Sequence, residues 1–150
     1  MSLSLIVQPH LGLGQIHLGS SRAQIIALLG EPDHREEFKA EEEDEATEFL
    51  EYEELELELG FSAEDGDRLG VIRCGSDDLR LESSEVIGTR IEELQERYPS
   101  FELDDDGEDG TSDYADEELD LSVNVARGRI VSLSMFPAWS KDDEPIWPKS

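Results

Sequence analysis

The stretch that decides the fold is LGLGQIHLGSSRAQIIALLGEP, residues 11–32, in which closely spaced glycines lead into a short helical pattern. Its second half predicts a helix. Ser20 or Ser21 is a natural N-cap, and Gly30 with Pro32 ends the pattern. Between these ends the apolar residues form a stripe at helical spacing: Ile25, Ile26, Leu28 and Leu29. A helix this short is held only by packing against other elements.

The glycines of the same stretch do not form a phosphate site. A dinucleotide-binding loop needs a third glycine where this chain has His17, and the Gly-Lys-Ser/Thr motif of a P-loop is absent. A helix N-terminus attracts anions, but a net charge of −27 repels them. We therefore predict no nucleotide cofactor here.

Downstream, a period of two replaces the helical period. Residues 47–62 predict one strand, and residues 68–75 predict its returning partner across a turn with Asp65-Gly66 at the tip. The acidic run 36–46 predicts a loop between the helix and this strand. The residues expected to face the core alternate with glutamate or glycine: Leu55, Leu57, Leu59 and Phe61.

A similar order of elements follows. Residues 88–99 predict a second helix, with Thr89 as N-cap and Glu92 as its capping-box partner. Residues 100–104 predict a strand and residues 105–118 an acidic loop. A hairpin with its turn near Arg127-Gly128 closes the pattern, and its inward positions are Leu119, Leu121, Val123, Val125, Val131, Leu133 and Met135.

These patterns predict an α+β fold class. Aligning Gly19-Ser20 with Gly88-Thr89 superposes the order of elements, so we expect a single compact domain over residues 1–150, made of two tandem units of a short helix followed by an antiparallel sheet. The units are approximately residues 11–83 and 84–137, and residues 138–150 form an extended tail. The alternative is an ordinary α+β domain whose elements happen to recur.

The helix-opening signature resembles that of small bacterial modules. The matching residues are Leu18, Gly19, Ser20, Leu28, Leu29, Gly30 and Pro32, with a fainter second copy at Ile87, Gly88 and Thr89. Similar signatures occur in the beta-lactamase inhibitory proteins, built from tandem helix-and-sheet repeats, and in the small lipoprotein subunit of the outer-membrane assembly machine. Uncharacterised bacterial proteins, some of them of the toxin-immunity type, also look like this. The resemblance implies a fold more than an activity, and the chain lacks the lipoprotein's anchoring cysteine.

No residue pattern points to catalysis or to a metal. The single cysteine, Cys74, excludes an internal disulfide and a cysteine zinc cluster, and we expect a buried thiol. His10, His17 and His34 lack the spacing of ligands on one element. We therefore predict no enzyme, no catalytic residue, no cofactor and no metal site. An enzyme that uses its carboxylates is kept as an alternative, because carboxylates occur throughout the chain.

One acidic stretch has calcium-loop spacing. ELDDDGEDGTSD, residues 102–113, places acidic residues at the first, third, fifth and twelfth loop positions and Gly107 at the sixth. The twelfth residue is Asp113 where a glutamate is usual, and the preceding SFEL reads as a strand. A solvated loop is the favoured interpretation.

The charge has two interpretations. The chain holds 39 acidic and 12 basic residues, which is typical of cells with high internal salt, where acidity maintains solubility. Alternatively, the negative field steers a basic partner protein to fast association. Nucleic acid is excluded as a partner, because its phosphates would be repelled. The chain starts without a signal-peptide pattern and has no stretch of membrane-span length, so we predict no membrane contact and a cytoplasmic location.

We therefore predict a non-catalytic binding protein, an acidic inhibitor or immunity-type protein that neutralises a basic partner such as a nuclease toxin. The alternative is a structural or assembly module of a salt-adapted bacterium. Trp139 and Trp147 lie in the predicted tail, either folded over the sheet or exposed as a contact. The predicted partner-binding residues are Glu51, Glu53, Glu54, Glu56, Glu58, Asp104, Asp105, Asp106 and Trp139.

Overall fold

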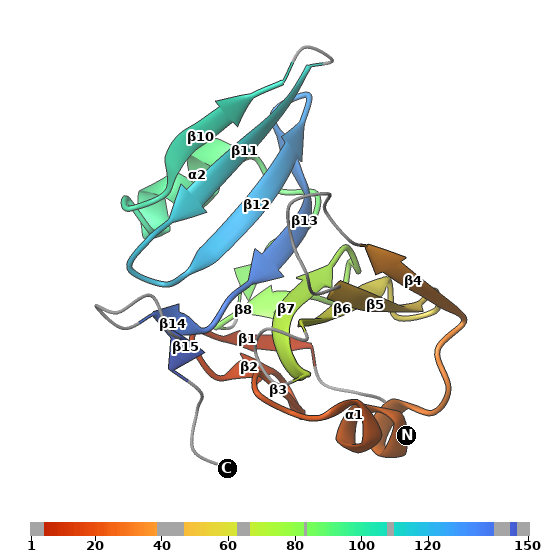
Figure 1. Cartoon of the computed structure of the whole chain (residues 1–150). Coiled ribbons are helices and arrows are strands. Elements are labelled where there is room, and N and C mark those ends of the chain that lie inside the picture. The colour runs from red at the N-terminus through yellow and green to blue at the C-terminus, as the bar shows by residue number, and fades with distance from the viewer. Residues whose placement is uncertain are drawn as a thin grey trace.

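The computed structural model of the chain describes residues 5–38, 47–62, 67–82, 84–107, 110–139 and 145–146. This part of the chain is mostly β, with 52% strand and 13% helix. Two sheets hold most of the strands (Figure 1).

The larger sheet has eight strands in the order β10-β11-β12-β13-β7-β6-β5-β4. All neighbours in it are antiparallel. Strands β4–β7 form one meander and β10–β13 another, and the pairing of β7 with β13 joins them (Figure 1). The bounds are β4 His34–Phe38, β5 Thr47–Tyr52, β6 Leu57–Ser62, β7 Arg68–Cys74, β10 Glu102–Asp106, β11 Thr111–Asp116, β12 Leu121–Ala126 and β13 Arg129–Met135.

The smaller sheet has five short strands in the order β3-β2-β1-β8-β9. It joins the N-terminal segment to the middle of the chain, because β1 pairs in parallel with β8. Two further short strands pair with each other. The bounds are β1 Ile6–Gln8, β2 Gly12–Leu13, β3 Ile16–His17, β8 Arg80–Leu81, β9 Ser84–Glu85, β14 Ala138–Trp139 and β15 Pro145–Ile146.

One face of the larger sheet is the core face, and the other is open. Register partners on adjacent strands share a face, so a row of partners can be followed across the sheet. One row on the core face crosses seven strands, and all its members from Val123 to Tyr52 are buried. The row is Leu103, Tyr114, Val123, Leu133, Cys74, Leu57 and Tyr52.

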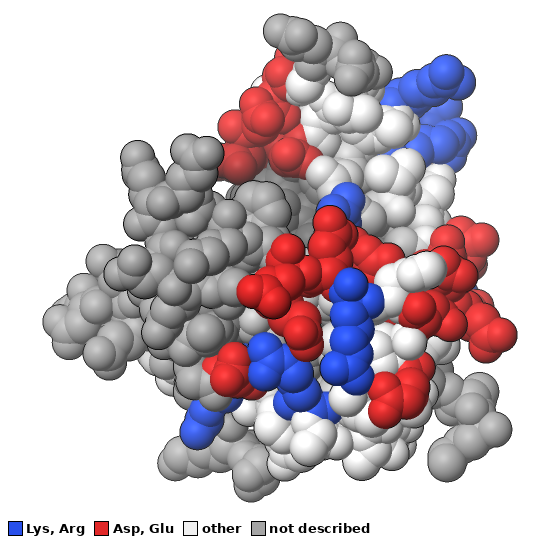
Figure 2. Space-filling model, turned by 45° about the vertical axis from the view of Figure 1, so that its right-hand side comes forward, with Lys and Arg blue, Asp and Glu red and all other residues white. Residues whose placement is uncertain are grey.

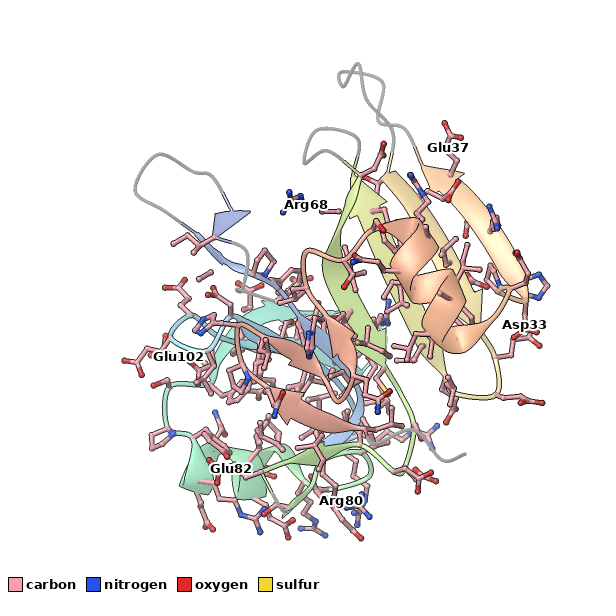
Figure 3. All side chains as sticks on the ribbon, turned by 90° about the horizontal axis from the view of Figure 1, so that it is seen from below. Asp33, Glu37, Arg68, Arg80, Glu82 and Glu102 are labelled. Atoms are coloured by element: carbon pink, nitrogen blue, oxygen red, sulfur yellow. The ribbon has the colours of Figure 1, made fainter. Side chains whose placement is uncertain are left out.

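The two helices of the described chain add apolar residues to the core. Helix α1, Arg22–Leu29, begins after the N-cap Ser21 and lies against β5 and β6, where the Arg22 guanidinium is 5.4 Å from the centre of the Phe61 ring (Figure 3). Ile25 is its buried residue. Ser21 as N-cap is one of the two expected positions, and the capping box that it forms with Gln24 fixes the choice.

Helix α2, Ile91–Arg97, buries Ile91 and Leu94. Its N-cap is Arg90, whose side chain makes no capping hydrogen bond. The Thr89 hydroxyl donates instead to the Val86 carbonyl oxygen at 2.7 Å. The predicted capping box of Thr89 with Glu92 is therefore wrong, because the helix begins one residue later than the pattern indicated.

The predicted fold class is wrong. The chain is not an α+β domain of two tandem helix-plus-sheet units, because the fold is mostly β and its helices are short. The strands of both halves share one eight-stranded sheet through β7 and β13, and the N-terminal segment and residues 80–85 build a second sheet. The extent of one domain, residues 1–150, stays a prediction.

Three predicted segments also differ from the structure. The strand expected over residues 47–62 is a hairpin, because residues 53–56 turn between β5 and β6. Part of the acidic run 36–46 belongs to β4, and residues 39–46 lie outside the described chain. Much of the acidic loop expected over residues 105–118 is strand, in β10 and β11. The turn tip Asp65-Gly66 lies outside the described residues.

The predicted hairpin with its turn near Arg127-Gly128 is confirmed, except that one residue expected to face the core is exposed. Strands β12 and β13 pair around Arg127-Gly128, and Leu121, Val123, Val125, Leu133 and Met135 are buried. Leu119 precedes the strand and is partly buried. Val131 was expected to face the core but is 47% exposed.

Candidate functional site

The β5–β6 hairpin places four of the five predicted glutamates around one groove of about 380 Å³. Glu51 and Glu58 are register partners on the open face of the sheet. Glu53 and Glu56 belong to the turn that connects the two strands. The fifth, Glu54, is exposed in the same turn. The remaining residues that line the groove are Tyr52, Leu57, Arg73, Gly75 and Ser132.

Backbone hydrogen bonds hold the turn that carries Glu53 and Glu56. The Glu53 N–H donates to Asp33 Oδ2 at 2.8 Å, and the Glu56 N–H donates to the Glu53 carbonyl oxygen at 3.1 Å. Glu56 has a φ of 52°, in the left-handed region, and its carbonyl oxygen accepts from the Gly75 N–H at 3.0 Å. Asp33 lies at the margin of the molecule beside β4 (Figure 3). The turn is thus tied to the start of β4 and the end of β7, which fixes the rim of the groove.

Among the described residues that line the groove, Arg73 is the single cation. Its Nη1 lies 3.7 Å from Glu58 Oε2, and its Nη2 donates to Asn124 Oδ1 at 3.0 Å. The guanidinium is therefore shared between the groove and β12. Four carboxylates against one guanidinium leave the groove negative at neutral pH.

A polar network continues from the groove across the open face. Asn124 Oδ1 also accepts from the Ser132 hydroxyl at 2.8 Å, and Asn124 Nδ2 donates to Asp113. Arg73, Ser132, Asn124 and Asp113 belong to four different strands, which meet because β7 pairs with β13. Sequence reasoning missed Arg73, Asn124 and Ser132, since no local pattern signals this pairing.

One further groove carboxylate, that of Glu53, and two carboxylates outside the groove lie beside basic side chains. His34 Nε2 lies 2.7 Å from Glu53 Oε1, and Arg22 lies 2.9 Å from Glu48 and 3.1 Å from Asp67. Figure 2 shows Arg side chains lying between Asp and Glu side chains over the face that it displays. The predicted broad negative field is therefore interrupted by local ion pairs.

The remaining predicted residues lie elsewhere. Asp104, Asp105 and Asp106 are exposed on β10, at the outer edge of the larger sheet, with β11 and β12 between them and the seam of β13 with β7. Trp139 contributes its backbone to β14, but its side chain and the whole of Trp147 lie outside what the structure describes. The structure thus separates the predicted acidic residues into a groove and an edge.

The calcium-loop alternative does not fit the structure. Residues 102–106 and 111–113 belong to paired strands, so the spacing that imitates a calcium loop is extended along a hairpin. In the described chain, no group of three or more His, Cys, Asp or Glu side chains could hold a metal ion.

Cys74 is buried, as expected, with 1% of its surface exposed. Burial raises the pKa of its thiol to about 11, so the thiol is protonated at neutral pH. Such a thiol is a poor nucleophile.

No family model matches this chain, and no curated protein matches it. Among solved structures, it is similar to an extracellular protein containing an SCP domain from Bacillus anthracis str. Ames, with a TM-score of 0.48 and 16% sequence identity. The match covers 80% of this chain and 44% of that protein, so the chain spans less than half of its length. The resemblance to beta-lactamase inhibitory and toxin-immunity proteins stays a prediction. Among the described residues, neither helix is long and apolar enough to cross a membrane.

Proposed function

We propose that this protein is a non-catalytic binding protein whose acidic groove receives a lysine or arginine side chain of a basic partner protein. Binding blocks the partner's activity, as an inhibitor of a nuclease toxin would. The proposal keeps the cytoplasmic location expected from the sequence.

The observation that carries the proposal is the groove itself. Glu51, Glu53, Glu56 and Glu58 line one hollow of about 380 Å³, which is large enough for the end of a long side chain. Hydrogen bonds between charged groups are stronger than neutral ones, and carboxylates fixed on a hairpin need little ordering on binding. The net charge of −27 adds long-range attraction for a basic protein.

The test starts from the whole chain immobilised and incubated with an extract of the source cells at low and at high salt. Basic proteins retained at low salt are identified and purified, and each is titrated by calorimetry. The groove variant is Glu51→Gln/Glu53→Gln/Glu56→Gln, and the matched control is Glu92→Gln/Glu93→Gln/Glu96→Gln on the exposed side of α2. Both variants remove three carboxylates, so they change the net charge equally.

We expect the groove variant to bind the partner at least about tenfold more weakly, and the control to change the affinity much less. The wild-type chain should also lower the partner's own activity at equimolar concentration. If no basic protein is retained at low salt, the binding function is wrong. Equal weakening by both variants would mean that the charge of the whole molecule, and not the groove, attracts the partner.

A further inference from the structure

The outer edge of the larger sheet is open. Among the described strands, β10 pairs with β11 and has no neighbour on its other side (Figure 1). All five of its side chains are exposed. A strand in this position presents unpaired N–H and C=O groups, which another strand could pair with.

The apolar row of the core face ends at this edge. Leu103 is the register partner of Tyr114, which in turn pairs with Val123. Val123 is 1% exposed, whereas Leu103 is 54% exposed because no described strand lies beyond it. One more strand with an apolar side chain beside Leu103 would continue the row and bury this leucine.

Acidic residues flank Leu103 on the opposite face. Glu102 and Asp105 share the open face, since their register partners are Ala115 and Asp113. Asp104 is the extra residue at the register shift between Leu103 and Asp105. Glu102 lies at the outer margin of the molecule (Figure 3). Along β10 the open face thus presents the carboxylates of Glu102 and Asp105, and the core face presents the apolar side chain of Leu103.

A hollow of about 270 Å³ lies at the same edge. Leu103 and Ala115 supply its apolar lining, and the carboxylates that surround them belong to Glu102, Asp104, Glu117 and Glu118. Within the described chain, no Lys or Arg lines this hollow. The described lining of this hollow is therefore negatively charged.

We propose that β10 binds an extended basic segment of a partner protein by strand addition. The segment pairs its backbone with the free edge, places lysine or arginine opposite Glu102 and Asp105, and places an apolar side chain beside Leu103. A second copy of β10 is a poor occupant, because its carboxylates would face those of the first. The same row of charge that prevents self-pairing selects a basic strand. This surface is distinct from the groove, and the proposal stands without it.

The test uses a synthetic peptide of about eight residues in which lysine and valine alternate. Its control has the same sequence with every backbone nitrogen methylated, which keeps the charge and removes the donors from both edges of the peptide. Backbone NMR of the whole chain follows both titrations, together with hydrogen exchange of the β10 amides. We expect the unmodified peptide to shift and protect the β10 amides, and the methylated peptide to bind at least about tenfold more weakly.

Variants separate this edge from general charge. Glu102→Lys/Asp105→Lys should abolish the protection of the β10 amides by the lysine–valine peptide, while Glu92→Lys/Glu96→Lys on α2 should reduce it far less. The groove variant Glu51→Gln/Glu53→Gln/Glu56→Gln should leave this protection nearly unchanged, because a lysine that enters the groove does not contact β10. The proposal is overturned if the methylated peptide binds equally well, or if the two charge reversals weaken binding equally. A dimer of the chain that forms through β10 without peptide would also overturn it.

Discussion

Ser21 closes the start of α1 with a reciprocal pair of hydrogen bonds. The Gln24 N–H donates to Ser21 Oγ at 3.2 Å, and the Ser21 N–H donates to Gln24 Oε1 at 2.8 Å. Ser20 instead forms backbone hydrogen bonds: its N–H donates to the His17 carbonyl oxygen, and its carbonyl oxygen accepts from the Leu69 N–H. The sequence alone left both serines as candidates, because either hydroxyl precedes the apolar stripe.

We predict that Ser21→Ala lowers the free energy of unfolding by about 1 kcal/mol, since the N-cap hydrogen bond is lost. Ser20→Ala should change it by less than about 0.5 kcal/mol. Urea unfolding followed by circular dichroism measures both values. Equal losses in the two variants would contradict the assignment of the cap.

Cys74 links stability to alkaline pH. Burial raises the pKa of its thiol to about 11 from an ordinary value of 9.0. Between these two values the native state holds a proton that the unfolded state has lost, so stability falls as pH rises through this window. The contribution is fully present below about pH 9.

We predict that the wild-type protein loses on the order of 2 kcal/mol more than Cys74→Ala between about pH 8 and about pH 10.5. Burial also raises the pKa of Tyr52, but this contribution is common to both proteins. The difference between wild type and Cys74→Ala therefore reports the thiol alone. Urea titrations at each pH give the values. Parallel pH profiles of the two proteins would show that the thiol does not contribute.

At the scale of elements, a bulge in β13 decides which side chain enters the core. Val125 pairs with Ile130 and Asn124 with Ser132, so Val131 is the extra residue. An extra residue reverses the alternation of a strand. Ile130 is therefore buried, with 1% exposed, and Val131 turns outward.

We predict that Ile130→Ala lowers the free energy of unfolding by about 3 kcal/mol, as a large-to-small change in a core does. Val131→Ala should cost less than about 1 kcal/mol. Urea unfolding of the two variants checks this order. A larger loss for Val131 would mean that the alternation of the sequence, without a bulge, describes the strand.

The strands with one buried face are the ones whose alternation the sequence shows. Leu57, Leu59 and Phe61 alternate with glutamate or glycine, so their period is visible. The strand predicted over residues 100–104 overlaps β10 in residues 102–104 but misses its end, because all of β10 is exposed, and the two- and three-residue strands of the smaller sheet are too short to show a period. Leu55 lies in the turn but continues the alternation of apolar residues seen in β6. The sequence pattern therefore predicted one long strand instead of the hairpin of β5 and β6.

At the scale of the whole molecule, the candidate site was predicted in part. The glutamates of residues 51–58 are neighbours in sequence, and a hairpin keeps such neighbours together. The aspartates of β10 were assigned to the same surface, but the strand order places them at the far edge. Strand order depends on pairing between distant segments, and the distribution of charge along the sequence does not predict that pairing.

The net charge predicts a response to salt. With 39 acidic and 12 basic residues, we expect repulsion to outweigh the local ion pairs in the native state. We predict that the urea midpoint rises from about 10 mM to about 150 mM NaCl, as the screening length falls from about 30 Å to about 8 Å.

The α2 variant Glu92→Gln/Glu93→Gln/Glu96→Gln is the control for this effect, because with less repulsion to screen it should respond less to NaCl. Sedimentation velocity at each salt concentration keeps association from being mistaken for stability. A midpoint that falls with added salt would show that the ion pairs, such as that of Arg22 with Glu48, dominate.

The pairing of β1 with β8 constrains how the protein is made. Ile6 and Val7 leave the ribosome early, yet their partners are Arg80 and Leu81. The central strand β7 similarly waits for residues 133–135 of β13. Neither sheet is complete until most of the chain has been synthesised, so folding depends on late contacts between distant segments and is expected to be slow. Residues 1–30 hold no Asp or Glu, but from Glu31 onward the growing chain becomes strongly acidic, and mutual repulsion between nascent chains then keeps their unpaired strands apart.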